Sequence, residues 1–286
     1  MLQWGTSYLL EKGFNESRLT VELLLCHLLN LERIQLYTNF DKPLTDAELS
    51  LFKGLFQRRL QHEPLQYIIG TTEFMGLEFV VDQRVLIPRP ETEVLVEQVI
   101  YYAKEHFSGR PLRILDIGTG SGCIAVSLAA LLENASIIAF DKSSDAVEVA
   151  RINAQKNGVE KKIALSVQDV FEISGADFSS KFHLVVSNPP YVSKMEFQEL
   201  QPEIKKFEPS FAVTDDDDGL NFYRKIADIG RSLLEAEGAI IVEHAYNQLV
   251  SARKIFVDAG WGNIRPIGDY GGNHRCLVAS KFREST

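Results

Sequence analysis

The sequence predicts an α/β fold with a mostly parallel sheet, an antiparallel C-terminal strand, a small N-terminal helical domain and a linking β-hairpin. Three observations lead to this prediction. Residues 1–70 carry only helical patterns, apolar runs alternate with helical segments after residue 89, and the last two runs are joined too tightly for a crossover helix. The expected divisions are therefore a helical domain at 1–70, a hairpin linker at 71–88 and an α/β domain at 89–286.

The first 70 residues favour a small helical bundle. The segment Asn15–Leu31 is rich in Leu and Glu and contains no Gly or Pro, which favours a helix. Thr45 and Glu48 form the Thr-x-x-Glu pattern of a helix start, and apolar residues follow at helical spacing. From residue 70 to residue 88 apolar and polar residues alternate around Gly76, which predicts a hairpin between the two domains.

Strands and helices alternate through the rest of the chain, which indicates a parallel sheet. The last connection contains Gly271 and Gly272 and has room only for a tight turn, so the two final strands should pair antiparallel. The expected strands are 112–117, 136–141, 163–167, 182–187, 239–243, 263–267 and 275–281. The expected helices are 91–106, a segment ending near residue 132, 145–157, 220–235 and 247–259.

Composition and charge exclude several classes of protein. A net charge of −9 argues against unaided binding to nucleic acid, because clustered Lys and Arg carry the affinity for phosphates. Cys26, Cys123 and Cys276 are far apart and odd in number, which excludes a disulfide framework and a Cys-x-x-Cys metal site. The first residues do not resemble a basic leader, and no apolar stretch is long enough to cross a bilayer. We expect a cytoplasmic monomer that binds no metal, membrane or nucleic acid directly.

A glycine cluster follows the first expected strand of the sheet. It spans Gly118–Gly122 (Gly-Thr-Gly-Ser-Gly), and a helix is expected after it. Glycines at this point let the backbone pass close to a ligand at the carboxyl edge of the sheet. Asp141 ends the next strand, where a carboxylate can accept hydrogen bonds from both ribose hydroxyls of a nucleoside. Together they predict a nucleoside cofactor, and the alternative is a tight turn with a capping Asp.

A second cluster, Asn188-Pro189-Pro190-Tyr191, follows the apolar strand that ends at Ser187. Two successive prolines stiffen the chain and remove two donors, which leaves backbone carbonyls available to accept from a substrate. The side chain of Asn188 adds another acceptor. Two acceptors converging on one planar amino group can aim its nitrogen at an electrophile, and Tyr191 can cover the face of that group. The alternative is a turn that merely ends the strand.

These clusters resemble those of the class I S-adenosylmethionine-dependent methyltransferases that act on planar nitrogens and carry an Asn/Asp-Pro-Pro-Tyr motif. That group includes enzymes for DNA bases, RNA and glutamine. The segments Ile87–Glu93 (IPRPETE) and Glu63–Gly70 (EPLQYIIG), with the helical N-terminal domain, resemble the HemK/PrmC family of release factor N5-glutamine methyltransferases. The resemblance extends to Glu208-Pro209, Asp218–Leu220 and Gly272–Arg275.

The resemblance implies a Rossmann-like class I methyltransferase fold and a set of site residues. The residues implied to bind the cofactor S-adenosyl-L-methionine are Gly118, Thr119, Gly120, Ser121, Gly122, Asp141, Val170 and Asn188. The implied substrate contacts are Asn188, Pro189, Pro190 and Tyr191, of which Asn188, Pro189 and Tyr191 would be catalytic. Many members have an aromatic residue where this chain has Val170, so we expect the adenine to pack on Val170 and Phe171.

The implied substrate is the glutamine of the Gly-Gly-Gln loop in class-1 peptide chain release factors. The products would be N5-methylglutamine and S-adenosylhomocysteine, and the helical domain would supply the surface on which the release factor docks. Two alternatives stay open. One is an enzyme that methylates adenine N6 or cytosine N4 of an exposed base, which would need a basic groove. The other is a non-catalytic nucleoside-binding module.

Several other residues have two interpretations. Arg89, Glu91 and Glu93 either brace a helix start or act directly at the site. His244 stands where the family more often has an apolar residue, and we expect a partly buried structural histidine. The acidic run Asp215–Asp218 is expected to be a solvated loop rather than a cation site, because nothing nearby completes the spacing of a calcium loop.

Overall fold

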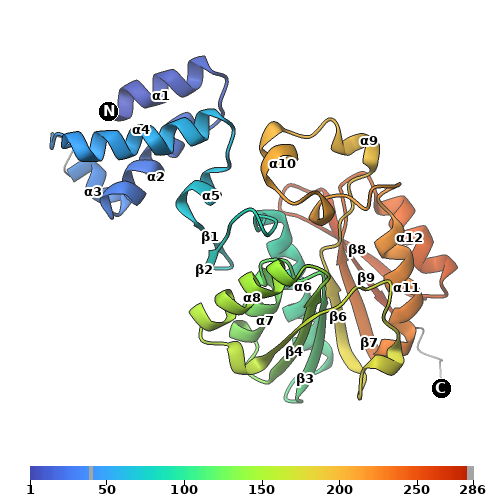
Figure 1. Ribbon diagram of the computed structural model, residues 1–286. Helices are drawn as coiled ribbons and strands as arrows, with labels where there is room; N and C mark the ends of the chain where they lie inside the picture. Colours follow the sequence, from blue (N-terminus) through green and yellow to red (C-terminus); the bar gives the residue numbers. More distant parts are fainter. Residues whose placement is uncertain (39–40, 282–286) are drawn as a thin grey trace. The chain divides into compact units, whose positions relative to one another are not determined.

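The chain forms two units in the structure, a computed structural model that describes residues 1–38 and 41–281 (Figure 1). One unit, which we call the helical unit, comprises Met1–Thr71 and Pro202–Phe207. The other, the α/β unit, comprises Thr72–Gln201 and the described part of Glu208–Thr286. The expected domain 89–286 includes residues 282–286, which lie outside the described residues.

The helical unit packs short helices around one apolar core. Leu9, Leu24 and Phe52 are fully buried there, and Gly5 lets α1 approach α2, since a Cβ on Gly5 would lie 3.1 Å from a methyl of Val21. The expected helix over 15–31 is confirmed as α2. The helices are α1 (Leu2–Glu11), α2 (Ser17–Leu29), α3 (Arg33–Thr38), α4 (Asp46–Leu60), α5 (Leu65–Ile69) and α10 (Pro202–Phe207).

Polar contacts cap α4 and attach α10 to the helical unit. Thr45 Oγ1 accepts from the Glu48 backbone N–H at 3.2 Å and Glu48 accepts from the Thr45 N–H at 2.7 Å, so the expected capping box at the start of α4 is confirmed. The segment α10 is attached through Glu203, which accepts from both terminal nitrogens of Arg59 at 3.1 Å.

A buried glutamate ties α2 to α3. Glu22 is 1% exposed, and its carboxylate accepts from Arg18 Nε at 2.9 Å, Arg33 Nη2 at 2.6 Å and the Tyr37 hydroxyl at 2.5 Å. Burial alone would raise the pKa of this carboxyl, but the three donors lower it to about 2. Glu22 is therefore a charged structural residue whose oxygens are well supplied with partners.

The expected hairpin is confirmed as β1 (Thr71–Phe74) and β2 (Leu77–Val80). Its two turn residues, Met75 and Gly76, both have positive φ, which is the geometry that two-residue hairpin turns prefer. Asn153, which is fully buried in the α/β unit, accepts from the Val80 N–H at 2.7 Å and donates to the Val80 and Ser121 carbonyls at 3.0 and 2.8 Å. One side chain thus joins the hairpin to the glycine loop.

The α/β unit is built on a seven-stranded sheet with the strand order β5-β4-β3-β6-β7-β9-β8. All its neighbouring strands are parallel except β9, which is antiparallel to both β7 and β8. The predicted mostly parallel sheet and its antiparallel C-terminal strand are confirmed. The strands are β3 (Leu112–Ile117), β4 (Ala135–Asp141), β5 (Ile163–Val167), β6 (Phe182–Ser187), β7 (Leu234–Glu243), β8 (Asn263–Gly268) and β9 (His274–Ser280).

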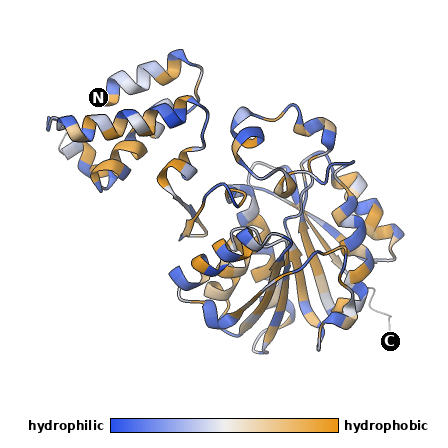
Figure 2. Ribbon diagram, in the orientation of Figure 1, coloured by the Kyte–Doolittle hydropathy of each residue, from blue (hydrophilic) through white to orange (hydrophobic). Residues whose placement is uncertain are grey.

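Helices cover both faces of this sheet (Figure 1). Side chains of α6 and α7 pack on one face, and those of α11 and α12 pack on the other. The strands between them are hydrophobic along most of their length, as expected when a sheet is buried on both faces (Figure 2). The helices are α6 (Pro90–His106), α7 (Cys123–Leu131), α8 (Ser144–Lys156), α9 (Lys194–Phe197), α11 (Asn221–Leu233) and α12 (Leu249–Asp258).

The strand at 239–243 was predicted too short. β7 begins at Leu234, directly after α11, and the expected helix end at Glu235 is wrong by two residues. Residues 234–237 (Leu-Glu-Ala-Glu) are good helix formers, so local preference favours continuing the helix. Pairing with β6 decides otherwise, because Leu234 lies opposite Phe182 and is fully buried.

The register of the central strands brings the two predicted clusters together. β3 and β6 are neighbours, with Asp116 opposite Val186, so the loops that follow these strands start side by side. The Ser187 hydroxyl donates to the Ile117 carbonyl at 2.7 Å and fixes the two strand ends to each other. The strand order reverses between β3 and β6, and open α/β sheets bind their ligands at such a point.

Candidate active site

The glycine loop between β3 and α7 has the backbone geometry that its sequence predicts. Gly118, Gly120 and Gly122 all have positive φ, at 73°, 54° and 80°. A Cβ at Gly118 or Gly120 would meet no atom within 4 Å, so both glycines border open space, whereas a Cβ at Gly122 would lie 3.0 Å from Ala150 of α8. The first two glycines therefore leave room for a ligand, and the third permits close helix packing.

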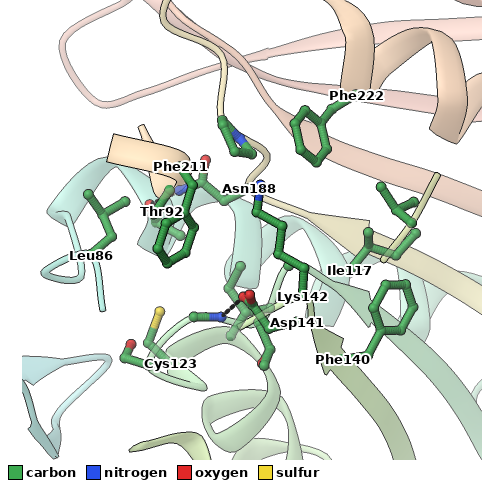
Figure 3. Close-up of a pocket in the computed structure, with 18 of the residues that line it drawn as sticks. Leu86, Thr92, Ile117, Cys123, Phe140, Asp141, Lys142, Asn188, Phe211 and Phe222 are labelled. Atoms are coloured by element: carbon green, nitrogen blue, oxygen red, sulfur yellow. Dashed lines mark hydrogen bonds between the residues drawn. The ribbon is translucent and has the colours of Figure 1, made fainter. Parts of the chain in front are cut away.

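Two carboxylates accept hydrogen bonds from residues of this loop. Asp116 is fully buried at the end of β3, where it accepts from the Thr119 hydroxyl at 2.7 Å, and burial raises its pKa to about 7. Asp141 ends β4 and accepts from the Gly120 N–H at 2.9 Å and the Ser143 N–H at 3.0 Å. Burial raises the pKa of Asp141, and those two hydrogen bonds oppose the rise. Figure 3 shows Asp141 in the same cavity as Asn188.

The turn after β6 presents Asn188 to the cavity and Tyr191 to the core. Asn188 Nδ2 donates to the Thr92 hydroxyl of α6 at 3.0 Å. The Tyr191 hydroxyl donates to Glu243 at the end of β7, at 3.3 Å, and the Tyr191 ring packs against the core that α11 and α12 form with the sheet. The Tyr191 carbonyl accepts from Gln248 at 2.7 Å. These three contacts fix Tyr191 and so stabilise the turn after β6.

The cavity lies between the glycine loop, the end of β4, the turn after β6 and the loops that contain Leu86–Arg89, Gln168–Val170 and Phe211–Ala212 (Figure 3). Phe211 and Phe222, which the sequence analysis did not single out, form part of the cavity wall (Figure 3). The lining residues outside the predicted set are Leu86, Ile87, Pro88, Arg89, Thr92, Ile117, Cys123, Ile124, Phe140, Lys142, Gln168, Asp169, Phe211, Ala212 and Phe222.

The structure brings most of the predicted site residues into this one cavity. Those that line it are Gly118, Thr119, Gly120, Ser121, Asp141, Val170, Asn188 and Pro190. The described residues Gly122, Pro189 and Tyr191 lie outside the lining. Phe171 is half exposed and also lies outside it, with its ring edge-on to Phe222 at 5.0 Å. Phe222, in contrast to Phe171, lines the cavity.

Of the three residues at the start of α6 that had two interpretations, Arg89 lines the cavity, whereas Glu91 and Glu93 do not. Arg89 lines the cavity and donates to both oxygens of buried Glu208, at 2.6 and 2.7 Å. Burial raises the pKa of Glu208 and the Arg89 charge opposes this rise. Glu93 accepts from the Met75 N–H at 2.6 Å and so anchors the hairpin turn. Glu91 forms a long ion pair of 3.9 Å with Arg275.

His244 is more deeply buried than predicted. It is 0% exposed rather than partly buried, and burial lowers its pKa. Its Nδ1 lies 2.8 Å from the Ala245 carbonyl, while Nε2 has no hydrogen-bond partner among the described residues. β9 pairs antiparallel with β7 and continues beside His244, whose backbone N–H donates to the Arg275 carbonyl at 2.8 Å. The sequence did not reveal that this strand would bury His244.

The acidic run forms a turn before α11. Asp215 accepts from the backbone N–H groups of Gly219 and Asn221, and Asp218 pairs with Arg224. Across residues 1–38 and 41–281, no group of three or more His, Cys, Asp or Glu side chains is arranged to hold a metal ion. No helix in the same ranges combines the length and apolar character needed to cross a membrane.

A seven-stranded sheet with this strand order and a cavity at its switch point is the architecture of a class I methyltransferase. Residues 109–255 match the model of a methyltransferase domain, and residues 1–70 match the PrmC N-terminal domain. Among solved structures, the hMettl16 catalytic domain in complex with a hairpin has a TM-score of 0.57, with 16% identity over 85% of this chain and 83% of that chain. That likeness concerns the fold alone.

Curated relatives narrow the class. The release factor glutamine methyltransferase of Geobacter sulfurreducens is 42% identical over 277 residues, which cover 97% of this chain and 94% of the relative. The enzyme of the same name from Chlorobaculum tepidum is 39% identical, with coverages of 94% and 92%. The chain belongs to the release factor glutamine methyltransferase family, and the resemblance seen in its sequence is confirmed.

Proposed function

We propose that this protein methylates the side-chain amide nitrogen, N5, of the glutamine in the Gly-Gly-Gln loop of class-1 peptide chain release factors, with S-adenosyl-L-methionine as methyl donor. The observation that carries the proposal is the position of Asn188. It lies in the wall of the cavity beside the glycine loop and Asp141, with its amide held from behind by Thr92. A polar amide acceptor therefore lies beside the nucleoside site, where an amide substrate would need it.

The residues of the cavity fit S-adenosylmethionine. Open space at Gly118 and Gly120 allows the backbone to approach the cofactor closely. Each oxygen of Asp141 accepts one backbone N–H, and its remaining lone pairs are available to ribose hydroxyls. Val170 and Phe222 give an apolar wall for the adenine, and the buried Gln168 Oε1 lacks a partner among the described residues. An adenine amino group could supply that partner.

Orientation is the main catalytic requirement, because an amide nitrogen shares its lone pair with the carbonyl and is a weak nucleophile. When bound, S-adenosylmethionine supplies an electrophilic methyl group. Asn188 and the Pro189 carbonyl would accept the two N–H bonds of the substrate amide and hold its nitrogen in line with the methyl group. Acceptors at those hydrogens also stabilise the positive charge that develops on nitrogen. Pro190 and Tyr191 would hold the turn that carries these acceptors.

We assign the recognition of the intact release factor to the helical region 1–70, the connection to 71–88 and the chemistry to 89–286. The cavity residues all belong to the α/β unit, whereas the helical unit contains a compact core and buried ion pairs. Its contribution would be contact area with a protein partner. The chain would act as a monomer and without direct contact to nucleic acid, in keeping with its net charge of −9.

The proposal is tested by incubating the protein and S-adenosylmethionine with intact release factor, and in parallel with DNA and RNA oligonucleotides. Mass spectrometry should find one methyl group on the glutamine of the Gly-Gly-Gln peptide and none on the nucleobases. Methylation of adenine or cytosine alone would favour the base-modifying alternative. Cofactor binding without transfer to any of these substrates would favour the non-catalytic one.

A further inference from the structure

The amide of Asn188 can face the cavity in two ways, and only one of them suits the proposed reaction. Its oxygen accepts hydrogen bonds and its nitrogen donates them, while the two ends have almost the same shape. A substrate amide that offers N–H groups requires the oxygen. Something in the protein must therefore distinguish the two ends of Asn188, and the surrounding hydrogen bonds decide which end faces inward.

The first part of that discrimination is Thr92, in the first turn of α6. Thr92 is 2% exposed, and its hydroxyl oxygen lies 3.0 Å from Asn188 Nδ2 (Figure 3). A hydroxyl can donate one hydrogen bond and accept others. Thr92 selects the nitrogen end of Asn188 only if its single proton is directed elsewhere, because a proton aimed at Asn188 would attract the oxygen end instead.

The second part is Glu243, at the end of β7. This carboxyl is 2% exposed, and its Oε1 accepts from the Tyr191 hydroxyl at 3.3 Å. Its Oε2 has no close hydrogen-bond partner among the described residues. Burial raises the pKa of Glu243 to about 7, and the neighbouring Thr92 and Tyr191 hydroxyls oppose that rise. A buried carboxyl oxygen without a partner can accept a hydrogen bond, so Glu243 Oε2 offers the Thr92 proton a destination away from Asn188.

We propose that Thr92 and Glu243 are positioning residues that turn the amide oxygen of Asn188 toward the cavity. Glu243 takes the Thr92 proton, the Thr92 oxygen then accepts from Asn188 Nδ2, and Asn188 Oδ1 faces the substrate. This inference rests on the proposed function, because it assigns a purpose to the oxygen end of Asn188. It also explains why a helix start and two strand ends, far apart in the sequence, meet at this turn.

The test replaces Thr92 in the full-length protein. Thr92→Val keeps the shape of the side chain and removes the hydroxyl, and Thr92→Ser keeps the hydroxyl. We expect Thr92→Val to lower kcat on release factor at least tenfold, with the Kd for S-adenosylmethionine within about twofold of wild type. Thr92→Ser should keep most of the wild-type kcat. Equal kcat for Thr92→Val and wild type would overturn the proposal, and so would a Thr92→Ser variant as slow as Thr92→Val.

A double-mutant cycle separates positioning from general packing. If Thr92 acts through Asn188, then Thr92→Val should cause almost no further loss in the Asn188→Ala background. A full tenfold loss there would overturn the proposal. Thr92→Ala serves as the second variant should Thr92→Val fail to fold, because it removes the hydroxyl without placing a methyl beside Glu243. If the wild-type enzyme transfers no methyl group to release factor, the proposed function itself fails, which is a different result from any of these.

Discussion

The two units of the molecule treat a buried glutamate in opposite ways. Glu22 in the helical unit receives hydrogen bonds from Arg18, Arg33 and Tyr37, and its pKa falls to about 2. Glu243 in the α/β unit is equally buried but has one oxygen without a close partner among the described residues, and its pKa rises to about 7.

The comparison shows that the buried carboxylate of the helical unit has hydrogen-bond partners for both oxygens, whereas that of the α/β unit has one oxygen without a partner among the described residues. A fully partnered buried charge fixes neighbouring helices to one another. Groups with raised pKa values cluster at functional sites. Here Asp141 lines the cavity, and Asp116 and Glu243 each have one oxygen without a partner among the described residues. The helical unit therefore has the polar organisation of a scaffold, and the α/β unit that of a site.

The strongest test of this contrast is Asn188→Ala. We expect methyl transfer to fall by about a hundredfold, because an acceptor that orients the substrate amide is lost. Cofactor affinity and the urea midpoint of unfolding should change little. Steady-state kinetics with release factor, together with calorimetry of S-adenosylmethionine, measure both. Near-normal turnover by the folded variant would remove Asn188 from the mechanism.

Asp141→Ala should act on the cofactor instead of the chemical step. If the Asp141 carboxylate accepts from two ribose hydroxyls, as we propose, its removal should weaken S-adenosylmethionine binding by roughly 10–100-fold, or about 1.5–3 kcal/mol. Part of the effect would come through the glycine loop, since Asp141 also holds the Gly120 N–H. Isothermal titration calorimetry gives the affinity directly. An unchanged Kd would show that the ribose lies elsewhere in the cavity.

The pH dependence of unfolding should have opposite signs for the two glutamates. The pKa of Glu22 falls from 4.5 to about 2 on folding, so its contribution to stability is present above pH 4.5 and is lost as the pH falls toward 2. The pKa of Glu243 rises from 4.5 to about 7, so its contribution is greatest below pH 4.5 and is lost as the pH rises through 7.

Urea unfolding at a series of pH values checks this prediction. Glu243→Gln should flatten the change in unfolding free energy between pH 4.5 and 7 by on the order of 1–3 kcal/mol. Asp116 titrates in the same window and should retain part of the slope. Glu22→Gln should flatten only the acid side. If both variants altered the same pH range, the contrast between the two carboxylates would be wrong.

The smallest effect is expected from Thr45→Ala. The change removes one half of the capping box on α4 and should lower the unfolding free energy by about 1 kcal/mol. The kcat on release factor should stay at its wild-type value, because α4 belongs to the helical unit. Thr45→Ser is the matched control and should restore stability. A large loss of kcat in Thr45→Ala would mean that the helical unit contributes to the chemical step.

Local patterns predicted the elements whose ends are marked in the sequence. β3, β5 and β6 begin and end at the predicted residues, since each is an apolar run bounded by polar or turn-forming residues. The antiparallel pairing of β8 with β9 was predicted, but the placement of β9 between β7 and β8 was not. Strand order depends on contacts between distant segments, and no local pattern records them.

The same division applies to the candidate site. The glycine loop and Asn188 each follow a recognisable strand and Asp141 ends one, so the sequence marked these positions. Phe211 and Phe222 were not singled out, because their approach to the cavity depends on how the segment Ser210–Ala212 and α11 pack against distant parts of the chain. The pairing of Asn188 with Thr92 joins residues 96 positions apart. The contacts of Tyr191 with Glu243, Gln248 and the core also join distant segments, and the expectation that its ring covers the substrate amide stays a prediction.

The hydrogen bonds of Asn153 have a consequence for protein engineering. A chimaera that exchanges the helical unit between family members needs a junction that leaves the α/β unit undisturbed. Because Asn153 bonds both to Val80 of the hairpin and to Ser121 of the glycine loop, replacing the hairpin would disturb the loop that approaches the cofactor. A junction near Gly70, before β1, keeps this connection intact. The hairpin should therefore be transplanted with the α/β unit and not with the helical unit.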